Sequence, residues 1–156
     1  MSRIKEFHFE WCDAWHNIDS GYDTILETSE SGKVILQCLV NLKPQQINLT
    51  DREDMFIHAL EECNIRDWNG NGYYNYDCFD GDMWALDVAY DDVVVRARGM
   101  NGYPLEFLDF VKMLCSRWGL KDSSIKKGIE PWIKQVKKGT VVEKLSDYEL
   151  SMPSYM

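Results

Sequence analysis

Alternation of apolar and polar residues is the feature of this sequence that most limits how the chain can fold. From Ile4 to Trp11, aromatic residues occupy every second position from residue 7 onward, and charged or polar residues lie between them. Successive side chains of a strand point to opposite faces, so the pattern predicts a strand with one buried face. Trp84 to Tyr90 repeats this alternation, with Asp87 between large apolar residues. A sheet that buries one face is therefore expected.

Turn-forming residues connect strand-like segments into two predicted hairpins. Segments 22–28 and 33–40 flank a turn that ends at Gly32, where glycine permits a positive φ. The second of these arms is largely apolar, which indicates a central strand. An aspartate pair then turns the chain from the strand that ends at Tyr90 into an apolar run at 93–98.

Three segments have the spacing of amphipathic helices. The first is predicted over residues 51–63, where Thr50 and Glu53 match a capping box. The second is predicted between residues 104 and 119, and a short third between 131 and 139. Both begin at a proline, which suits a first helical turn, and both end at a glycine, which suits a helix terminus.

The predicted element order is β-β-β-α-β-β-α-α, in which neighbouring strands are joined as hairpins. This order favours the α+β class, with an antiparallel sheet of about five strands and helices packed on one face. A chain of 156 residues fits one compact domain. We expect that domain to span residues 1–145 and residues 146–156 to form a loosely held tail.

The charge of the chain is unevenly distributed along its length. The formal net charge is −9; residues 1–120 hold 10 Lys and Arg against 21 Asp and Glu, whereas residues 121–156 hold 7 against 5. An acidic body repels phosphate backbones, so no direct nucleic-acid contact is expected outside the lysine-rich segment 121–144. A protein partner with a basic surface is expected instead.

The apolar segments of the chain are short. No stretch is long enough to span a bilayer, and the polar, charged start lacks the apolar segment of a signal peptide. The sequence therefore predicts a cytoplasmic protein without membrane contact, either a monomer or a homodimer. The five cysteines are scattered and include no C-x-x-C pair, so we expect reduced thiols.

One acidic segment resembles a calcium site in its first half. Asp67-x-Asn69-x-Asn71-Gly72 matches the start of an EF-hand loop, but position twelve is Cys78 where a bidentate glutamate is required. The residues that follow have the pattern of a strand instead of an exiting helix. Calcium binding is therefore not expected.

The spacing of three potential zinc ligands argues against zinc. His8, Cys12 and His16 are each four residues apart, as ligands along one helix face would be. On a strand, residues four apart are separated by about 13 Å and cannot share an ion.

The sequence also lacks a nucleophile elbow and a phosphate-binding loop. We predict no metal, no cofactor and no catalytic residues.

The stretch from Trp68 to Phe79 combines aromatic residues with Asn, Gly and Asp. Such combinations are typical of recognition surfaces, because large rigid side chains give contact area at low entropic cost. Trp68 and Phe79 are expected in the core, whereas the tyrosines are candidates for the surface. The predicted partner-binding residues are Tyr73, Tyr74, Tyr76, Asp77, Asp80, Asp82, Asp91 and Asp92.

The middle of the chain also carries three short motifs. Trp68, Gly70 and Tyr73 form a Trp-Gly-Tyr stretch, residues 80–86 read D-G-x-x-W-x-L, and residues 99–104 read G-x-N-x-Y-P. With these motifs the segment resembles an uncharacterised family of small bacterial proteins. The resemblance implies turns at the glycines, a helix start at the proline and a core tryptophan. It implies no activity.

Together these features favour a non-enzymatic, acidic binding protein. It would dock on and inhibit a basic bacterial protein that handles nucleic acid, as toxin-immunity proteins and phage anti-defence (anti-CRISPR) inhibitors do, since acidic domains can mimic phosphate charge. The alternative is a small hydrolase or ligand-binding protein with a pocket near residues 68–82, in which Asp80 or Asp82 acts as acid or base. A third interpretation is a dimerising module whose aromatic stretch forms a symmetric contact.

Overall fold

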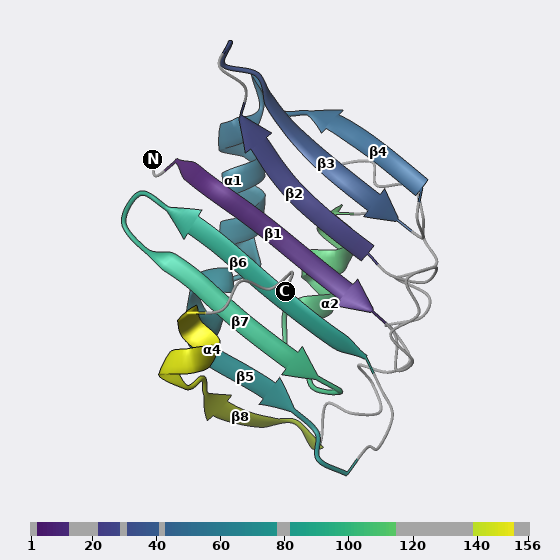
Figure 1. Cartoon of the computed structure of the whole chain (residues 1–156), viewed down its shortest axis with the longest axis vertical. Helices are drawn as coiled ribbons and strands as arrows, with labels where there is room; N and C mark the ends of the chain where they lie inside the picture. The colour runs from purple at the N-terminus through teal and green to yellow at the C-terminus, as the bar shows by residue number, and fades with distance from the viewer. Residues whose placement is uncertain are drawn as a thin grey trace.

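A computed structural model shows one large β-sheet with helices on both of its faces (Figure 1). The ranges that the structure describes are residues 3–12, 22–28, 31–40, 43–77, 82–114 and 139–151. Residues 131–138 of the third predicted helix lie outside these ranges, as does the predicted core residue Phe79.

The sheet contains eight strands in the spatial order β4-β3-β2-β1-β6-β7-β5-β8. The strands are β1 (Ile4–Cys12), β2 (Tyr22–Thr28), β3 (Val34–Val40), β4 (Lys43–Asn48), β5 (Asn71–Tyr74), β6 (Met83–Tyr90), β7 (Val94–Met100) and β8 (Val141–Lys144). Every neighbouring pair is antiparallel except β5 and β7, which are parallel. The mixture of helices and strands confirms the α+β class. The expected five-stranded, wholly antiparallel sheet is wrong, because the sheet has eight strands and one parallel pair.

The strands that were predicted from periodicity are present. The first strand and both hairpins occur where expected, as β1, β2–β3 and β6–β7. β3 lies between two other strands, as its apolar sequence indicates. The three strands that were missed are polar or short: β4 contains Pro44 and two glutamines, and β5 and β8 have four residues each. Segments of this kind carry too little alternation to distinguish a strand from a loop.

Two helices, α1 and α2, cover one face of the sheet, and the short helix α4 lies over the other (Figure 1). The helices are α1 (Glu53–Glu62), the 3-10 helix η2 (Ile65–Trp68), α2 (Phe107–Lys112) and α4 (Asp147–Ser151). The first two predicted helices are therefore confirmed in the described residues. The expectation that all helices pack on one face is wrong, because α4 lies on the opposite one. No described helix is long and apolar enough to cross a lipid bilayer.

Aromatic side chains fill the space between the sheet and the helices α1 and α2. The ring centroids of Phe7 and Phe56 are 5.3 Å apart, and those of Phe9 and Phe110 are 4.9 Å apart. Each pair joins β1 to one helix with an edge-to-face arrangement, which suits the quadrupoles of the rings. Trp68 is almost fully buried, 5.7 Å from Phe110, which confirms its predicted core position.

The predicted capping box at the start of α1 does not form. Arg52 is the residue before the first turn, and no side chain caps the helix there. The Thr50 hydroxyl instead accepts a hydrogen bond from the Val34 N–H at 3.1 Å and donates one to Asn48 Oδ1 at 2.6 Å. These contacts hold the connection between β4 and α1 against β3, so the hydroxyl is bonded to the sheet and not to the helix.

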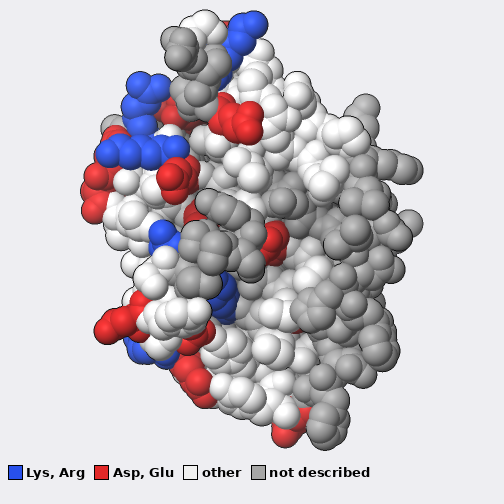
Figure 2. All heavy atoms as spheres, in the orientation of Figure 1, with Lys and Arg blue, Asp and Glu red and all other residues white. Residues whose placement is uncertain are grey.

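The second face of the sheet, which we call the open face, points away from α1 and α2 (Figure 1) and lies toward the viewer in Figure 2. His8 lies opposite Ile25 on one side and Asp87 on the other, and Asp87 lies opposite Arg96. Directly opposed residues of antiparallel strands have side chains on the same face. Charged and polar side chains therefore occupy the middle of the open face, in contrast to the aromatic core face.

Candidate partner-binding surface

β5 places two of the predicted tyrosines on opposite faces of the sheet. Tyr73 points to the core face, where its ring lies 5.9 Å from that of Trp84, and it is buried. Its hydroxyl accepts a hydrogen bond from Asn71 Nδ2 at 3.3 Å. The expectation that Tyr73 is a surface residue is therefore wrong, because alternation along a strand buries one of two neighbouring residues.

Tyr74 points to the open face, where its ring lies over Gly72. A Cβ atom at Gly72 would overlap the phenol, so only glycine leaves room for this arrangement. The Tyr74 hydroxyl donates a hydrogen bond to Glu149 Oε2 at 3.1 Å. Burial and the adjacent Glu149 carboxylate raise the pKa of Tyr74 to about 12, because both disfavour the phenolate.

Tyr76 follows β5 and is 67% exposed. Its ring centroid lies 5.8 Å from that of Tyr74, and a hydrogen bond with Glu143 on β8 raises the pKa of Tyr76. Asp77 is exposed next to it in the chain, and its N–H donates to Asn75 Oδ1 at 3.1 Å. Two of the three predicted tyrosines thus lie together on the open side of β5.

The short helix α4 adds a carboxylate and a further tyrosine to this region. The Glu149 N–H donates to the Ser146 hydroxyl at 3.2 Å, and Glu149 Oε1 accepts from the Ser146 N–H at 3.3 Å. This reciprocal pair is a capping box. Hydrogen bonds to the carboxylate lower the pKa of Glu149, first of all the one from the Ser146 backbone. Tyr148, on the same helix, is 71% exposed.

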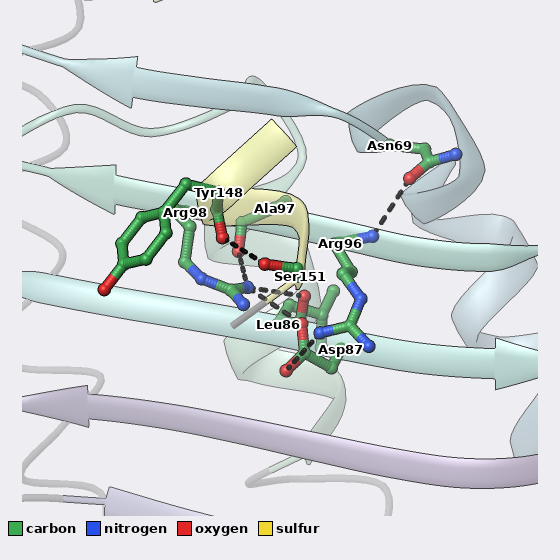
Figure 3. A network of polar contacts seen from close by, with 8 residues as sticks. All are labelled: Asn69, Leu86, Asp87, Arg96, Ala97, Arg98, Tyr148 and Ser151. Atoms are coloured by element: carbon green, nitrogen blue, oxygen red, sulfur yellow. Dashed lines mark hydrogen bonds and ion pairs between the residues drawn. The ribbon is translucent and has the colours of Figure 1, made fainter. Parts of the chain in front are cut away.

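Two arginines of β7 hold Asp87 on the open face near α4 (Figure 3). Arg98 Nη1 donates to Asp87 Oδ1 at 2.8 Å and to the Ala97 carbonyl oxygen at 2.9 Å. Arg96 Nη1 lies 3.9 Å from Asp87 Oδ2. Figure 3 shows both guanidinium groups beside Asp87 and the Tyr148 ring directed away from them. Both guanidinium groups therefore pair with a carboxylate of the same sheet.

These residues define what we call the tyrosine–carboxylate surface. It consists of Tyr74, Tyr76, Glu143, Asp147, Tyr148 and Glu149. Within the described ranges, neither Glu143 nor Asp147 makes an ion pair. Carboxylates of this kind suit an incoming lysine or arginine, and tyrosine rings pack well against a guanidinium group.

Sequence reasoning missed four members of this surface, those on β8 and α4. One signal could have found α4: Ser146 and Glu149 have the spacing of a capping box in the printed sequence. β8 gave no such signal, because its four residues follow a lysine-rich segment and do not alternate. Its place beside β5 depends on a contact between residues about seventy positions apart.

Asp82 has a structural partner in the core. It is 4% exposed, and its Oδ2 accepts a hydrogen bond from the Tyr103 hydroxyl at 2.9 Å. Its backbone carbonyl accepts from the Asn101 N–H at 2.9 Å. Burial, and secondarily the Asp82 charge, raise the pKa of Tyr103. Asp82 therefore ties the start of β6 to residues 101–103, and Asp80 lies outside the described ranges.

Asp91 and Asp92 lie at the turn between β6 and β7, which is the role that their sequence also suggested. Asp91 Oδ2 accepts a hydrogen bond from the Arg3 N–H at 3.1 Å, and Asp92 Oδ2 pairs with Arg66 Nη1 at 3.2 Å. The seven residues of β7 separate this turn from Tyr76 by about 20 Å. The predicted partner-binding residues therefore do not form a single surface.

Side chains of the segment that resembles an EF-hand are bonded within the fold. Asn69 Oδ1 accepts a hydrogen bond from the Arg96 N–H at 3.0 Å, and Asn71 Oδ1 accepts one from Lys144 Nζ at 3.0 Å. Among the residues with described positions, no group of three or more His, Cys, Asp and Glu could hold a metal ion. His16 of the zinc-like pattern lies outside those positions.

Comparison with known proteins gives no relative for this chain. No family model, no curated protein and no solved structure matches it. The resemblance of residues 68–114 to a bacterial family therefore stays a prediction. The chemistry of the tyrosine–carboxylate surface has to follow from its own contacts and charges.

Proposed function

We propose that this protein is a non-enzymatic binding protein that docks on a basic surface of another protein and blocks it. The observation that carries the proposal is the tyrosine–carboxylate surface, where exposed Tyr76 bonds Glu143 and exposed Tyr148 follows Asp147 on α4. Glu143 and Asp147 have no cation of their own among the described residues. Tyrosine and arginine are enriched among the few residues that carry most of the binding energy in many interfaces.

The charge of the chain supports a basic partner. A net charge of −9 attracts a positive surface over distances comparable with the Debye length, which is about 8 Å at physiological ionic strength. Such attraction raises the association rate and disfavours acidic competitors. Proteins that handle nucleic acid have basic channels, and we propose that a protein of this kind, in a bacterium or its phage, is the target.

A capture experiment tests which residues make the contact. The full chain, immobilised as bait in lysate of its native cell, should retain a basic protein, and Tyr76→Ala/Tyr148→Ala should lose it. Both rings are mostly exposed, so their removal should leave the fold intact. The matched control is Met55→Ala/Leu105→Ala, which removes side chains of 55% and 69% exposure from elsewhere on the molecule. Equal retention by the two double variants would refute the proposed surface.

A further inference from the structure

β8 forms one edge of the sheet (Figure 1), and all four of its residues are exposed. The other edge strand, β4, contains Pro44, which lacks an N–H and so interrupts pairing with a further strand. β8 contains no proline. The edge of β8 therefore keeps the backbone groups to which another strand can bond.

The register of β8 determines which of its backbone groups face outward. Just after the strand, the Leu145 N–H donates to the Gly70 carbonyl oxygen on the β5 side at 2.8 Å. Residues of an antiparallel pair alternate between bonded and non-bonded positions. Val141 and Glu143 therefore bond to β5. The N–H and C=O groups of Val142 and Lys144 point away from the sheet.

The side chains of β8 present different chemistry on the two faces. Glu143 lies opposite Gly72 and shares the open face with Tyr74 and the rest of the tyrosine–carboxylate surface. Val142 lies opposite Tyr73, so it points to the core face, and it is 55% exposed. A strand laid along β8 would meet Glu143 and Val141 on the open face. On the core face it would meet Val142 and Lys144, whose positive charge disfavours a further cation there.

We propose that an extended segment of a basic protein partner adds to β8 as a further, antiparallel strand of the sheet. Its lysine or arginine side chains lie on the open face beside Glu143, and its apolar side chains lie beside Val142. In this mode the main-chain hydrogen bonds give affinity and the alternating side chains give specificity. The inference rests on the proposed function and adds the mode of binding.

A second copy of the chain is a poorer occupant of this edge. Two β8 strands related by a twofold axis would be antiparallel, and the outward groups of Val142 and Lys144 would form the hydrogen bonds between them. In each such register the two Glu143 side chains lie opposite or diagonal to each other. Like charges at these positions are destabilising. Each copy also carries a net charge of −9, so the two copies repel.

Short fluorescein-labelled peptides in which lysine and valine alternate test this inference. When the peptide runs antiparallel to β8 with its valines on the Val142 side, the valine N–H groups face β8 and the lysine N–H groups face solvent. N-methylation of the valines should therefore weaken binding to the full chain by about tenfold or more, because bonds to Val142 and Lys144 are lost. N-methylation of the lysines is the matched control and should leave affinity within about twofold. Polarisation gives the affinities, and the NMR amide signals of Val142 and Lys144 should shift with the unmethylated peptide.

The outcomes separate the inference from the proposed function. Equal binding by the two methylated peptides would overturn strand addition; if both still bound in a salt-dependent way, docking of a basic partner would survive. No binding by any of the peptides would also overturn it, and the association kinetics of Glu143→Gln/Asp147→Asn would then decide the proposed function separately. A concentration-dependent dimer in sedimentation that Val142→Lys dissolves would assign the edge to a second copy.

Discussion

The Tyr74 hydroxyl connects the sheet to α4. It donates to Glu149 at 3.1 Å, and burial together with that carboxylate raises the pKa of Tyr74 to about 12. A raised pKa means that the fold favours the protonated phenol. Its contribution to stability is therefore fully present below the unfolded pKa of about 10, and it is lost as the pH rises from there through about 12.

An alkaline titration checks this account of Tyr74. The tyrosinate absorbance of the folded protein should develop at higher pH than that of the protein in urea, where the phenols ionise near pH 10. In the folded protein, Tyr74→Phe should reduce the tyrosinate absorbance that develops at the highest pH. In urea the same variant should lose the absorbance of one tyrosine that ionises near pH 10. Folded and unfolded titrations that coincide would contradict the contact with Glu149.

Ser146→Ala removes the cap of α4. Loss of such a cap costs about 0.5–2 kcal/mol of helix stability. The pKa of Glu149 should rise partway toward its ordinary value, because the bond from the Ser146 hydroxyl is lost whereas the bond from the Ser146 N–H remains. Because the fold lowers this pKa, the contribution of Glu149 is present above the ordinary value and is lost as the pH falls through the folded pKa. Amide exchange across α4 and an NMR titration of the Glu149 carboxyl measure both effects.

The control for this prediction is Ser151→Ala, at the other end of the same helix. The Ser151 hydroxyl donates to the Tyr148 carbonyl oxygen at 2.7 Å and does not reach the start of α4. It should leave the pKa of Glu149 unchanged. If both serine variants shifted that pKa equally, the capping box would not be its cause.

The two capping-box motifs of the chain show what a motif alone can predict. Thr50 and Glu53 have the required spacing, as do Ser146 and Glu149, but only the second pair bonds reciprocally. The Thr50 hydroxyl is bonded to the Val34 N–H instead. That bond comes from a strand distant in sequence, so local spacing could not reveal it.

At the scale of elements, the β6–β7 hairpin is the part of the fold most directly set by alternation. Trp84 and Leu86 point to the core face and are almost fully buried, and Trp84 Nε1 donates to the Gly102 carbonyl oxygen at 2.9 Å. Asp91 and Asp92 are exposed at the turn. The stability of the hairpin therefore depends on its core side chains and not on its turn carboxylates.

Denaturation experiments test this division within the hairpin. Trp84→Ala and Leu86→Ala should each lower the free energy of unfolding by about 2–5 kcal/mol, because both leave cavities in the core. Asp91→Asn and Asp92→Asn should change it by no more than about 0.5 kcal/mol, since exposed charges contribute little. Urea unfolding followed by tryptophan fluorescence or circular dichroism gives all four values. Similar small losses at all four positions would show that the core face is misassigned.

The elements that escaped prediction share a physical cause. Alternation predicted β1 and β6, and apolar runs beside turn residues predicted β3 and β7. β5 and β8 are held by pairing with neighbours, and β5 lies parallel to β7, which no hairpin signal could indicate. The candidate surface was half predicted for the same reason: Tyr74 and Tyr76 were named, whereas Glu143 and Tyr148 depend on where distant segments pack.

At the scale of the whole molecule, several arginines form ion pairs with carboxylates of the same chain. Arg3 pairs with Glu53 at 3.2 Å, Arg66 pairs with Asp92 at 3.2 Å, and Arg98 bonds Asp87. Figure 2 shows acidic and basic side chains interleaved along the left edge of the view, on the side of the β6–β7 turn in Figure 1. The carboxylates of β8 and the start of α4 differ in having no such partner among the described residues. A basic protein should meet its strongest attraction there.

Surface plasmon kinetics against the captured partner, at several salt concentrations, test the docking surface most directly. Two double variants remove the same charge: Glu143→Gln/Asp147→Asn at the tyrosine–carboxylate surface and Asp91→Asn/Asp92→Asn at the far turn. We predict that the first slows association severalfold and flattens its salt dependence, whereas the second leaves both close to the parent values, because close charges dominate steering. Circular dichroism confirms that both variants are folded. Equal effects of the two variants, or an unchanged association rate in the first, would contradict docking through this surface.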